Sequence, residues 1–122
     1  MRDYKKLDVW NKSHLLTKRV YTEVLPLLPI KERYALTSQL RRSSYSIPLN
    51  IVEGCDKNTD KDFAHYLDNA LGSAHEVEYT CYLIWDLGYI NKETYETINS
   101  ATNEVKAMLI TFIKFIRNKN NL

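Results

Sequence analysis

Apolar residues recur every three or four positions in four successive segments of this sequence, which is the spacing of one face of an α-helix. We expect helices over about residues 8–28, 31–53, 60–87 and 92–118. The 3 glycines and 3 prolines are too few for the turns of an all-β protein. Short connections favour an all-α, antiparallel up-down four-helix bundle in which residues 1–122 form one domain. The seven-residue repeat favours left-handed packing.

Each predicted helix has an apolar seam and identifiable ends. The expected seams are Trp10, His14, Thr17, Tyr21, Val24 and Leu28 in the first helix, Phe63, Leu67, Ala70, Ala74, Val77, Cys81 and Ile84 in the third, and Tyr95, Ile98, Thr102, Val105, Leu109, Phe112 and Ile116 in the fourth. The expected end signals are Pro29 after the first helix, Gly54 after the second, Thr59 with Asp62 before the third, Gly88 after it and Asn91 before the fourth. Pro48 either kinks the second helix or splits it in two.

Some apolar residues lie outside these seams. They are Leu16, Val20, Leu27, Tyr66, Leu83, Leu87, Met108 and Phe115. A monomeric bundle would expose them as a patch, and large apolar patches usually mark interfaces, so we expect a closed homo-oligomer. Gly72 lies inside the third helix, where we expect a close approach of another backbone. The alternative is that a broad core simply needs broad helices.

A polar stripe runs along the second helix between two apolar ones. At 100° per residue, Gln39, Arg42, Ser46, Asn50 and Glu53 fall on one narrow face. Arg42 and Glu53 are eleven positions apart and cannot pair with each other, so each is expected to meet a partner on a neighbouring helix or subunit. The stripe is either an internal hydrogen-bond network or a surface that contacts a partner.

The same stretch resembles a known family. Leu36-Thr37-Ser38-Gln39, Arg42, Ser46-Ile47-Pro48 and Asn50-Ile51-Val52-Glu53-Gly54 are similar to the signature of the 23S ribosomal RNA intervening-sequence proteins, and so are Leu7-Asp8-Val9-Trp10, residues 70–76 and Asp86-Leu87-Gly88-Tyr89-Ile90. The resemblance implies a bacterial, ribosome-associated four-helix bundle that assembles into a ring-shaped homopentamer. The family is also similar to accessory proteins of diversity-generating retroelements, which bind nucleic acid and a reverse transcriptase.

Charge is unevenly distributed although the net charge is only +2. Residues 1–50 hold 10 Lys/Arg against 4 Asp/Glu, residues 51–104 hold 3 against 11, and residues 105–122 hold 4 against none. Such a pattern suits a polyanion-binding face, charge-complementary docking between subunits, or solvated helices that happen to differ in charge. The candidate phosphate-binding residues are Lys5, Lys12, Arg19, Arg41, Lys114, Arg117 and Lys119.

Catalytic and metal-binding patterns are weak. A di-metal carboxylate bundle needs two carboxylate-x-x-His motifs, and only Asp62-Phe63-Ala64-His65 is present. His65, Asp68 and His75 share a helical face, which is more typical of surface residues than of metal ligands. The 2 cysteines fit no metal or disulfide framework, and the 3 glycines are scattered singly. We therefore expect no enzyme activity, no metal and no cofactor.

Two hypotheses of function follow. The first is a non-enzymatic oligomeric module that binds RNA or DNA through phosphates. The second is a protein-interaction scaffold, for example an accessory subunit of a reverse transcriptase, without nucleic-acid binding of its own. The start of the sequence has no signal-peptide pattern, and no run of about 18 apolar residues could span a membrane, so we expect a cytoplasmic location.

Overall fold

The computed structural model describes residues 2–119, which contain four α-helices and no strand. The α-helices are α1 (Asp8–Arg19), α2 (Leu36–Cys55), α3 (Asp60–Asp86) and α4 (Lys92–Asn118). A 3-10 turn, η1 (Tyr4–Lys6), precedes α1, and three short turns connect α1 to α2: η2 (Val20–Val24), η3 (Leu25–Leu27) and η4 (Ile30–Glu32). None of the described helices is long and apolar enough to cross a lipid bilayer.

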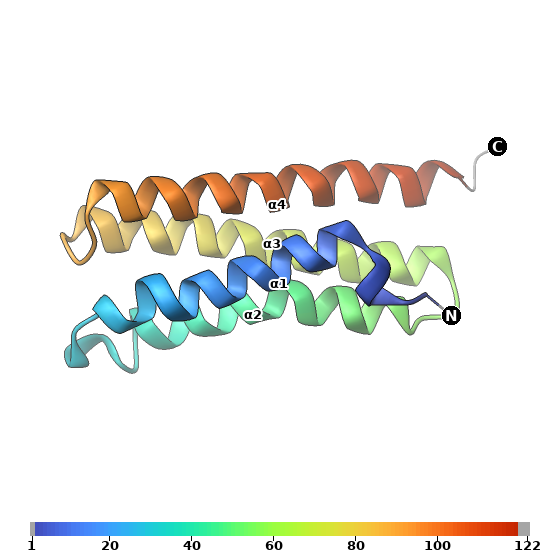
Figure 1. Cartoon of the computed structure of the whole chain (residues 1–122). Helices are drawn as coiled ribbons and strands as arrows, with labels where there is room; N and C mark the ends of the chain where they lie inside the picture. Colours follow the sequence, from blue (N-terminus) through green and yellow to red (C-terminus); the bar gives the residue numbers. More distant parts are fainter. Residues whose placement is uncertain (1, 120–122) are drawn as a thin grey trace.

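The four helices run alternately in opposite directions and lie side by side (Figure 1). Each helix packs against the next one in the sequence, and α1 packs against α4 to close the bundle. The predicted all-α, up-down bundle is therefore confirmed for the described residues. Its left-handed sense and its assembly into a ring stay predictions.

The first helix differs from the prediction in length and in the face that it buries. The α-helix ends at Arg19, and the chain continues as a π-helical turn and a 3-10 turn up to Leu27. Pro26 lacks the N–H that a regular helix would use there, which accounts for the early change of winding. The buried residues are Val9, Ser13, Leu16, Val20 and Val24, whereas His14 and Tyr21 are exposed. Four of the predicted seam positions therefore lie one residue C-terminal to the residues that are actually buried.

The second helix begins later and ends later than predicted. Residues Ile30–Glu32 form a separate 3-10 turn, and α2 starts at Leu36. Gly54 lies inside α2 and is not its stop, because a Cβ at this position would lie 2.9 Å from atoms of Phe63 and Tyr66. This close packing of α2 on α3 is the physical reason for the glycine. Pro48 does not split the element.

The third and fourth helices agree with the prediction within one residue. The Thr59 hydroxyl accepts a hydrogen bond from the Asp62 N–H (3.1 Å), and the Asn91 side chain accepts one from the Thr94 N–H (2.8 Å). Gly88 has φ +85° directly after α3, in the left-handed region that ends helices. All predicted seam residues of α3 are buried; in α4 they are buried except the half-buried Tyr95 and Phe112.

Gly72 was expected to mark a close backbone approach, and this expectation is wrong for the single chain. A Cβ at Gly72 would meet nothing within 4 Å, and the residue is exposed on α3. The predicted surplus of apolar residues is also smaller than expected, because Leu16 and Val20 belong to the core. Leu27, Leu87 and Phe115 are exposed as expected.

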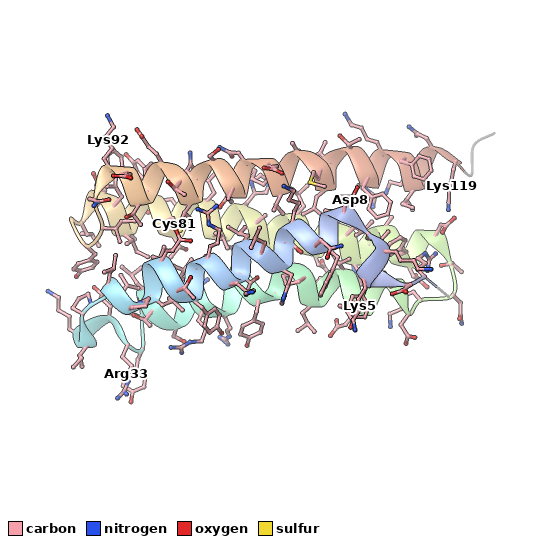
Figure 2. The ribbon with its side chains drawn as sticks, in the orientation of Figure 1. Lys5, Asp8, Arg33, Cys81, Lys92 and Lys119 are labelled. Carbon is pink, nitrogen blue, oxygen red and sulfur yellow. The ribbon has the colours of Figure 1, made fainter. Side chains whose placement is uncertain are left out.

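One end of the bundle is tied together by the residues before η1. The Arg2 guanidinium donates hydrogen bonds to the Lys57 carbonyl (2.8 Å) and to the Asp60 carboxylate (2.6 Å). Its Cζ also lies 4.2 Å from the centre of the Phe63 ring. Lys119, at the end of α4, lies 3.3 Å from the same Asp60 carboxylate (Figure 2). These contacts fix the start of the chain and the last turn of α4 to the α2–α3 connection.

Candidate functional site

The polar stripe of α2 lies along its contact with α3. Gln39 Nε2 donates to Glu76 Oε2 at 3.1 Å, and the hydroxyls of Ser46 and Ser73 share a hydrogen bond of 2.8 Å. Asn50 Nδ2 donates to the carbonyl and the hydroxyl of Ser46, at 2.8 and 3.0 Å. The middle of the stripe is therefore a half-buried hydrogen-bond network that joins two helices.

The two charged residues of the stripe behave differently from its middle. Arg42 and Glu53 are both exposed, and within residues 2–119 neither side chain has a hydrogen bond or an ion pair. The expected partner on a neighbouring helix of the same chain is not observed for either. A partner on another subunit stays a prediction. Both charges are available to an outside molecule in the single chain.

Four of the predicted phosphate-binding residues form ion pairs with carboxylates of the same chain. Lys12 Nζ lies 2.9 Å from Glu104, and Arg19 Nε lies 2.9 Å from Glu23. Arg117 makes a two-bond contact with Asp68, whose hydrogen bonding raises the pKa of the guanidinium above its usual value. Lys119 pairs with Asp60. These contacts lower the positive potential that the four residues offer to a polyanion.

The remaining three predicted residues lie in different places. Lys5, in η1, lies 5.9 Å from the centre of the Tyr4 ring, near the end of the bundle where the chain starts (Figure 2). Lys114 is exposed on the last part of α4. Arg41 is exposed on α2, and its guanidinium has no partner within the described residues. The structure therefore does not gather the seven predicted residues on one face.

A different group of positive charges lies on the face shared by α1 and α2. The Thr17 hydroxyl donates to the Ser44 carbonyl at 2.8 Å, which sets the register of these antiparallel helices. Tyr21 follows Thr17 by one turn, and Arg41 precedes Ser44 by about one turn. Because the two helices are antiparallel, Tyr21 and Arg41 lie level with each other. Lys18 is exposed on α1 next to Thr17, and so lies at the level of Ser44, nearly one turn from Tyr21. We call Lys18, Tyr21, Arg41 and Tyr45 the α1–α2 face.

Few carboxylates lie near this face, and Glu23, two residues after Tyr21, is paired with Arg19. Asp8 is the one carboxylate within α1 and Glu53 is the one within α2, and both lie toward the opposite end of their helices from Lys18 and Arg41. Arg33, in the connection before α2, points away from the bundle at the end where α2 begins (Figure 2). Sequence reasoning missed Lys18. The stretch of residues 33–52 holds three arginines and no carboxylate, which marks the α2 half of this face, but no such local signal points to Lys18.

The arrangement offers little for catalysis. Burial raises the pKa of the Cys81 thiol to about 12, so the reactive thiolate is not formed near neutral pH. His75 lies 3.9 Å from Glu78, and Asp68, which shares its predicted helical face, is held by Arg117. No group of three or more His, Cys, Asp or Glu side chains suited to a metal ion occurs within residues 2–119. The site is a set of surfaces and not an enclosed reaction centre.

Comparison with known proteins gives a matching family and similar solved structures. The family model described as 23S rRNA-intervening sequence protein matches residues 5–111. A crystal structure of a protein with unknown function, from the S23 ribosomal protein family of Bacteroides thetaiotaomicron, has 33% sequence identity and a TM-score of 0.79. The match covers 87% of this chain and 98% of that chain. No curated protein matches the sequence.

Proposed function

Because this chain belongs to the family of 23S rRNA-intervening sequence proteins, we propose that it is a non-enzymatic, homo-oligomeric binding module that associates with RNA or DNA through phosphate contacts. The observation that supports this proposal is the α1–α2 face, where the cations of Lys18 and Arg41 have no carboxylate partner within residues 2–119. A guanidinium or ammonium group without a carboxylate partner attracts a phosphate with its full positive charge. The family resemblance implies a homopentamer, so we favour five copies.

Contacts of this kind carry little sequence preference, because the phosphate backbone is the same at every nucleotide. Tyr21 and Tyr45 are each 41% exposed and flank the two cations, so they offer ring edges to unpaired bases. Each face would be repeated in every subunit of a closed ring. Repetition raises the overall affinity well above that of one face, provided that one nucleic acid reaches several subunits.

The test is a filter-binding assay of structured RNA and of duplex DNA at about 50 mM salt, where phosphate contacts are strong. Lys18→Gln combined with Arg41→Gln should weaken binding uniformly across sequences. The double change should also reduce the slope of log affinity against log salt by about 2 for each subunit engaged, one for each lost phosphate contact.

Lys12→Gln combined with Arg19→Gln is the matched control. It removes the same number of positive charges from residues that already form ion pairs with Glu104 and Glu23. We expect this variant to bind more tightly than the Lys18/Arg41 variant. Equal losses would contradict a special role of the α1–α2 face, because the ion-paired Lys12 and Arg19 would then contribute as much as Lys18 and Arg41.

A second candidate function is a protein-interaction scaffold, for example an accessory subunit of a reverse transcriptase. The exposed and unpaired charges of Arg42 and Glu53 support it, because they offer a protein partner one positive and one negative group on the same helix. The filter assay separates the two candidates. Retention of neither RNA nor DNA at micromolar protein would contradict nucleic-acid binding and favour the scaffold.

A further inference from the structure

Four aromatic rings gather on the side of the bundle formed by α3 and α4. Trp85 and Tyr95 are stacked, with ring centres 4.6 Å apart and planes at 6°. Tyr82 presents its edge to both, at 6.1 and 6.3 Å. Tyr79 lies one turn earlier on α3, and a shallow hollow of about 330 Å³ is lined by Tyr79, Tyr82, Tyr95, Glu78 and Asn99. We call Tyr79, Tyr82, Trp85 and Tyr95 the aromatic patch.

The patch is open to solvent, which is unusual for so many large rings. Tyr79 is 63% exposed and Tyr82 is 46% exposed. It lies near the end of the bundle where α3 turns into α4, and α1 and α2 lie on the other side of the molecule (Figure 1). The aromatic patch and the α1–α2 face are therefore on opposite sides, and they can be occupied at the same time.

Other rings of this protein are covered by its own cations. Six aromatic rings have a Lys or Arg over them: those of Tyr4, Tyr34, Phe63, Tyr66, Tyr89 and Phe115. The shortest such distances are 4.2 Å for Arg2 over Phe63 and 4.9 Å for Lys57 over Tyr66. Within residues 2–119, no cation lies over any ring of the aromatic patch. Trp85 and Tyr95 cover one face of each other, and the exposed rings of Tyr79 and Tyr82 remain accessible to a cation from outside.

The charged residues of α3 around the aromatic patch are acidic, which favours the binding of a cation. Residues 73–86 contain Glu76, Glu78 and Asp86 and no Lys or Arg. Asp86 lies on the same side of α3 as Tyr79, seven residues later, whereas Glu76 is turned toward α2 and accepts a hydrogen bond from Gln39. Glu78 lines the hollow and is held by Lys106 at 2.8 Å, while the Asp86 carboxylate has no partner within residues 2–119. A polyanion would be repelled here.

We propose that the aromatic patch binds an arginine- or lysine-bearing segment of a partner protein, whose cationic side chains lie against Tyr79 and Tyr82 and pair with Asp86. Rings and carboxylates together recognise guanidinium and ammonium groups through cation–π attraction and charge pairing. A hollow of about 330 Å³ has room for a single side chain. The proposal does not depend on nucleic-acid binding, because it uses the other side of the molecule.

The experiment measures fluorescence anisotropy of a labelled peptide of repeating Arg-Gly-Ser units, with the full-length protein as titrant. The same peptide with Glu in place of Arg should not bind. Tyr79→Ala combined with Tyr82→Ala keeps every charge of α3, so general attraction of the peptide to an acidic helix is unchanged. We expect this variant to bind the Arg peptide on the order of tenfold more weakly, because two ring contacts to cations are lost.

Two control variants make the result specific. Tyr34→Ala removes a tyrosine that is 89% exposed at another place, and Asp56→Asn is the counterpart of Asp86→Asn at the other end of the bundle. Tyr79→Phe with Tyr82→Phe should bind like the unchanged protein, because the ring faces are kept. Tyr34→Ala and Asp56→Asn should also leave binding unchanged, and Asp86→Asn should weaken it.

Several outcomes would overturn the proposal. Full binding by the Tyr79/Tyr82 alanine variant, with helical content unchanged by circular dichroism, would show that the rings are not used. Equal weakening of peptide binding by Tyr34→Ala would show that any exposed aromatic ring of the protein can bind the peptide. Loss of self-association in the alanine variant, measured by light scattering without peptide, would assign the patch to a second copy of this chain. Competition of the peptide by RNA without any effect of the α1–α2 variants would assign it to nucleic acid.

Discussion

Thr17 donates a hydrogen bond to a carbonyl that Pro48 leaves without its usual partner. In a regular helix the N–H of residue 48 would bond to the carbonyl of Ser44, but proline has no N–H. The Thr17 hydroxyl donates to this carbonyl from α1 at 2.8 Å, in a place where Ser44 is fully buried. One side chain thus satisfies the backbone of one helix and fixes the register of two.

Thr17→Val should destabilise the protein. Valine has nearly the same shape as threonine but no hydroxyl, so the buried Ser44 carbonyl loses its donor, which costs about 1–3 kcal/mol. The Thr17 hydroxyl also lies 3.1 Å from the Ser13 carbonyl, four residues earlier. Thr22→Val is the matched control, because the Thr22 hydroxyl likewise donates to a carbonyl four residues earlier (3.0 Å to Lys18) but is exposed and, within residues 2–119, has no bond to another helix. Urea denaturation at one fixed protein concentration measures both. Equal stability of the two variants would contradict this role of Thr17.

At the scale of helices, two glycines have opposite roles. Gly54 lies where α2 touches α3, with Phe63 and Tyr66 atoms 2.9 Å from the position of a Cβ. Gly54→Ala should lower the free energy of unfolding by about 1–3 kcal/mol, since an added methyl forces packed atoms apart. Gly72→Ala should raise it by about 0.5–1 kcal/mol, because the site is open and alanine favours helix.

Thermal or urea unfolding of the two alanine variants, side by side, measures this difference. Strong destabilisation by Gly72→Ala would indicate that another subunit packs closely on α3, as the sequence first suggested. Unchanged stability of Gly54→Ala would mean that Phe63 and Tyr66 move apart easily, and would contradict the tight α2–α3 contact.

The helices that could be predicted from the sequence are those with local signals. For α3 and α4, Thr59, Gly88 and Asn91 act on neighbouring backbone groups, and the seams are aliphatic, so the bounds agree within one residue. The face of α1 was misjudged because Trp10 and Tyr21 look like core residues but lie at the rim, with Val9 and Val20 inside. Aromatic side chains are long enough to reach apolar surface from the edge of a core, and the spacing pattern does not reveal this.

The candidate site could be predicted only in part, for a related reason. The polar stripe follows from the helical spacing of one segment, and its middle is a network between α2 and α3. Whether a cation is free depends on contacts far along the chain, such as Lys12 with Glu104 and Arg117 with Asp68. These pairs are set by the register of packed helices, which charge counts along a sequence do not contain.

For the whole molecule, the single chain leaves an apolar surface open to solvent. A groove of about 510 Å³ between the start of α1 and the end of α4 is lined by Val9, Met108, Phe112 and Phe115, among others. Phe115 is 59% exposed there. Exposed surface of this kind usually marks an interface, and we propose it as a contact between subunits.

Light scattering at micromolar protein should therefore give a mass well above 14.4 kDa, and five times this value if the ring is a pentamer. Phe115→Glu should shift the mass toward the monomer, because a carboxylate in an apolar contact must give up its hydration. Ile30→Glu is the matched control, since Ile30 is 88% exposed on the connection before α2 and lies outside the groove. A mass of 14.4 kDa for the unchanged protein would contradict assembly of any kind. If both variants lose assembly equally, the effect of Phe115→Glu is not specific to the groove. The subunit contact would then lie elsewhere.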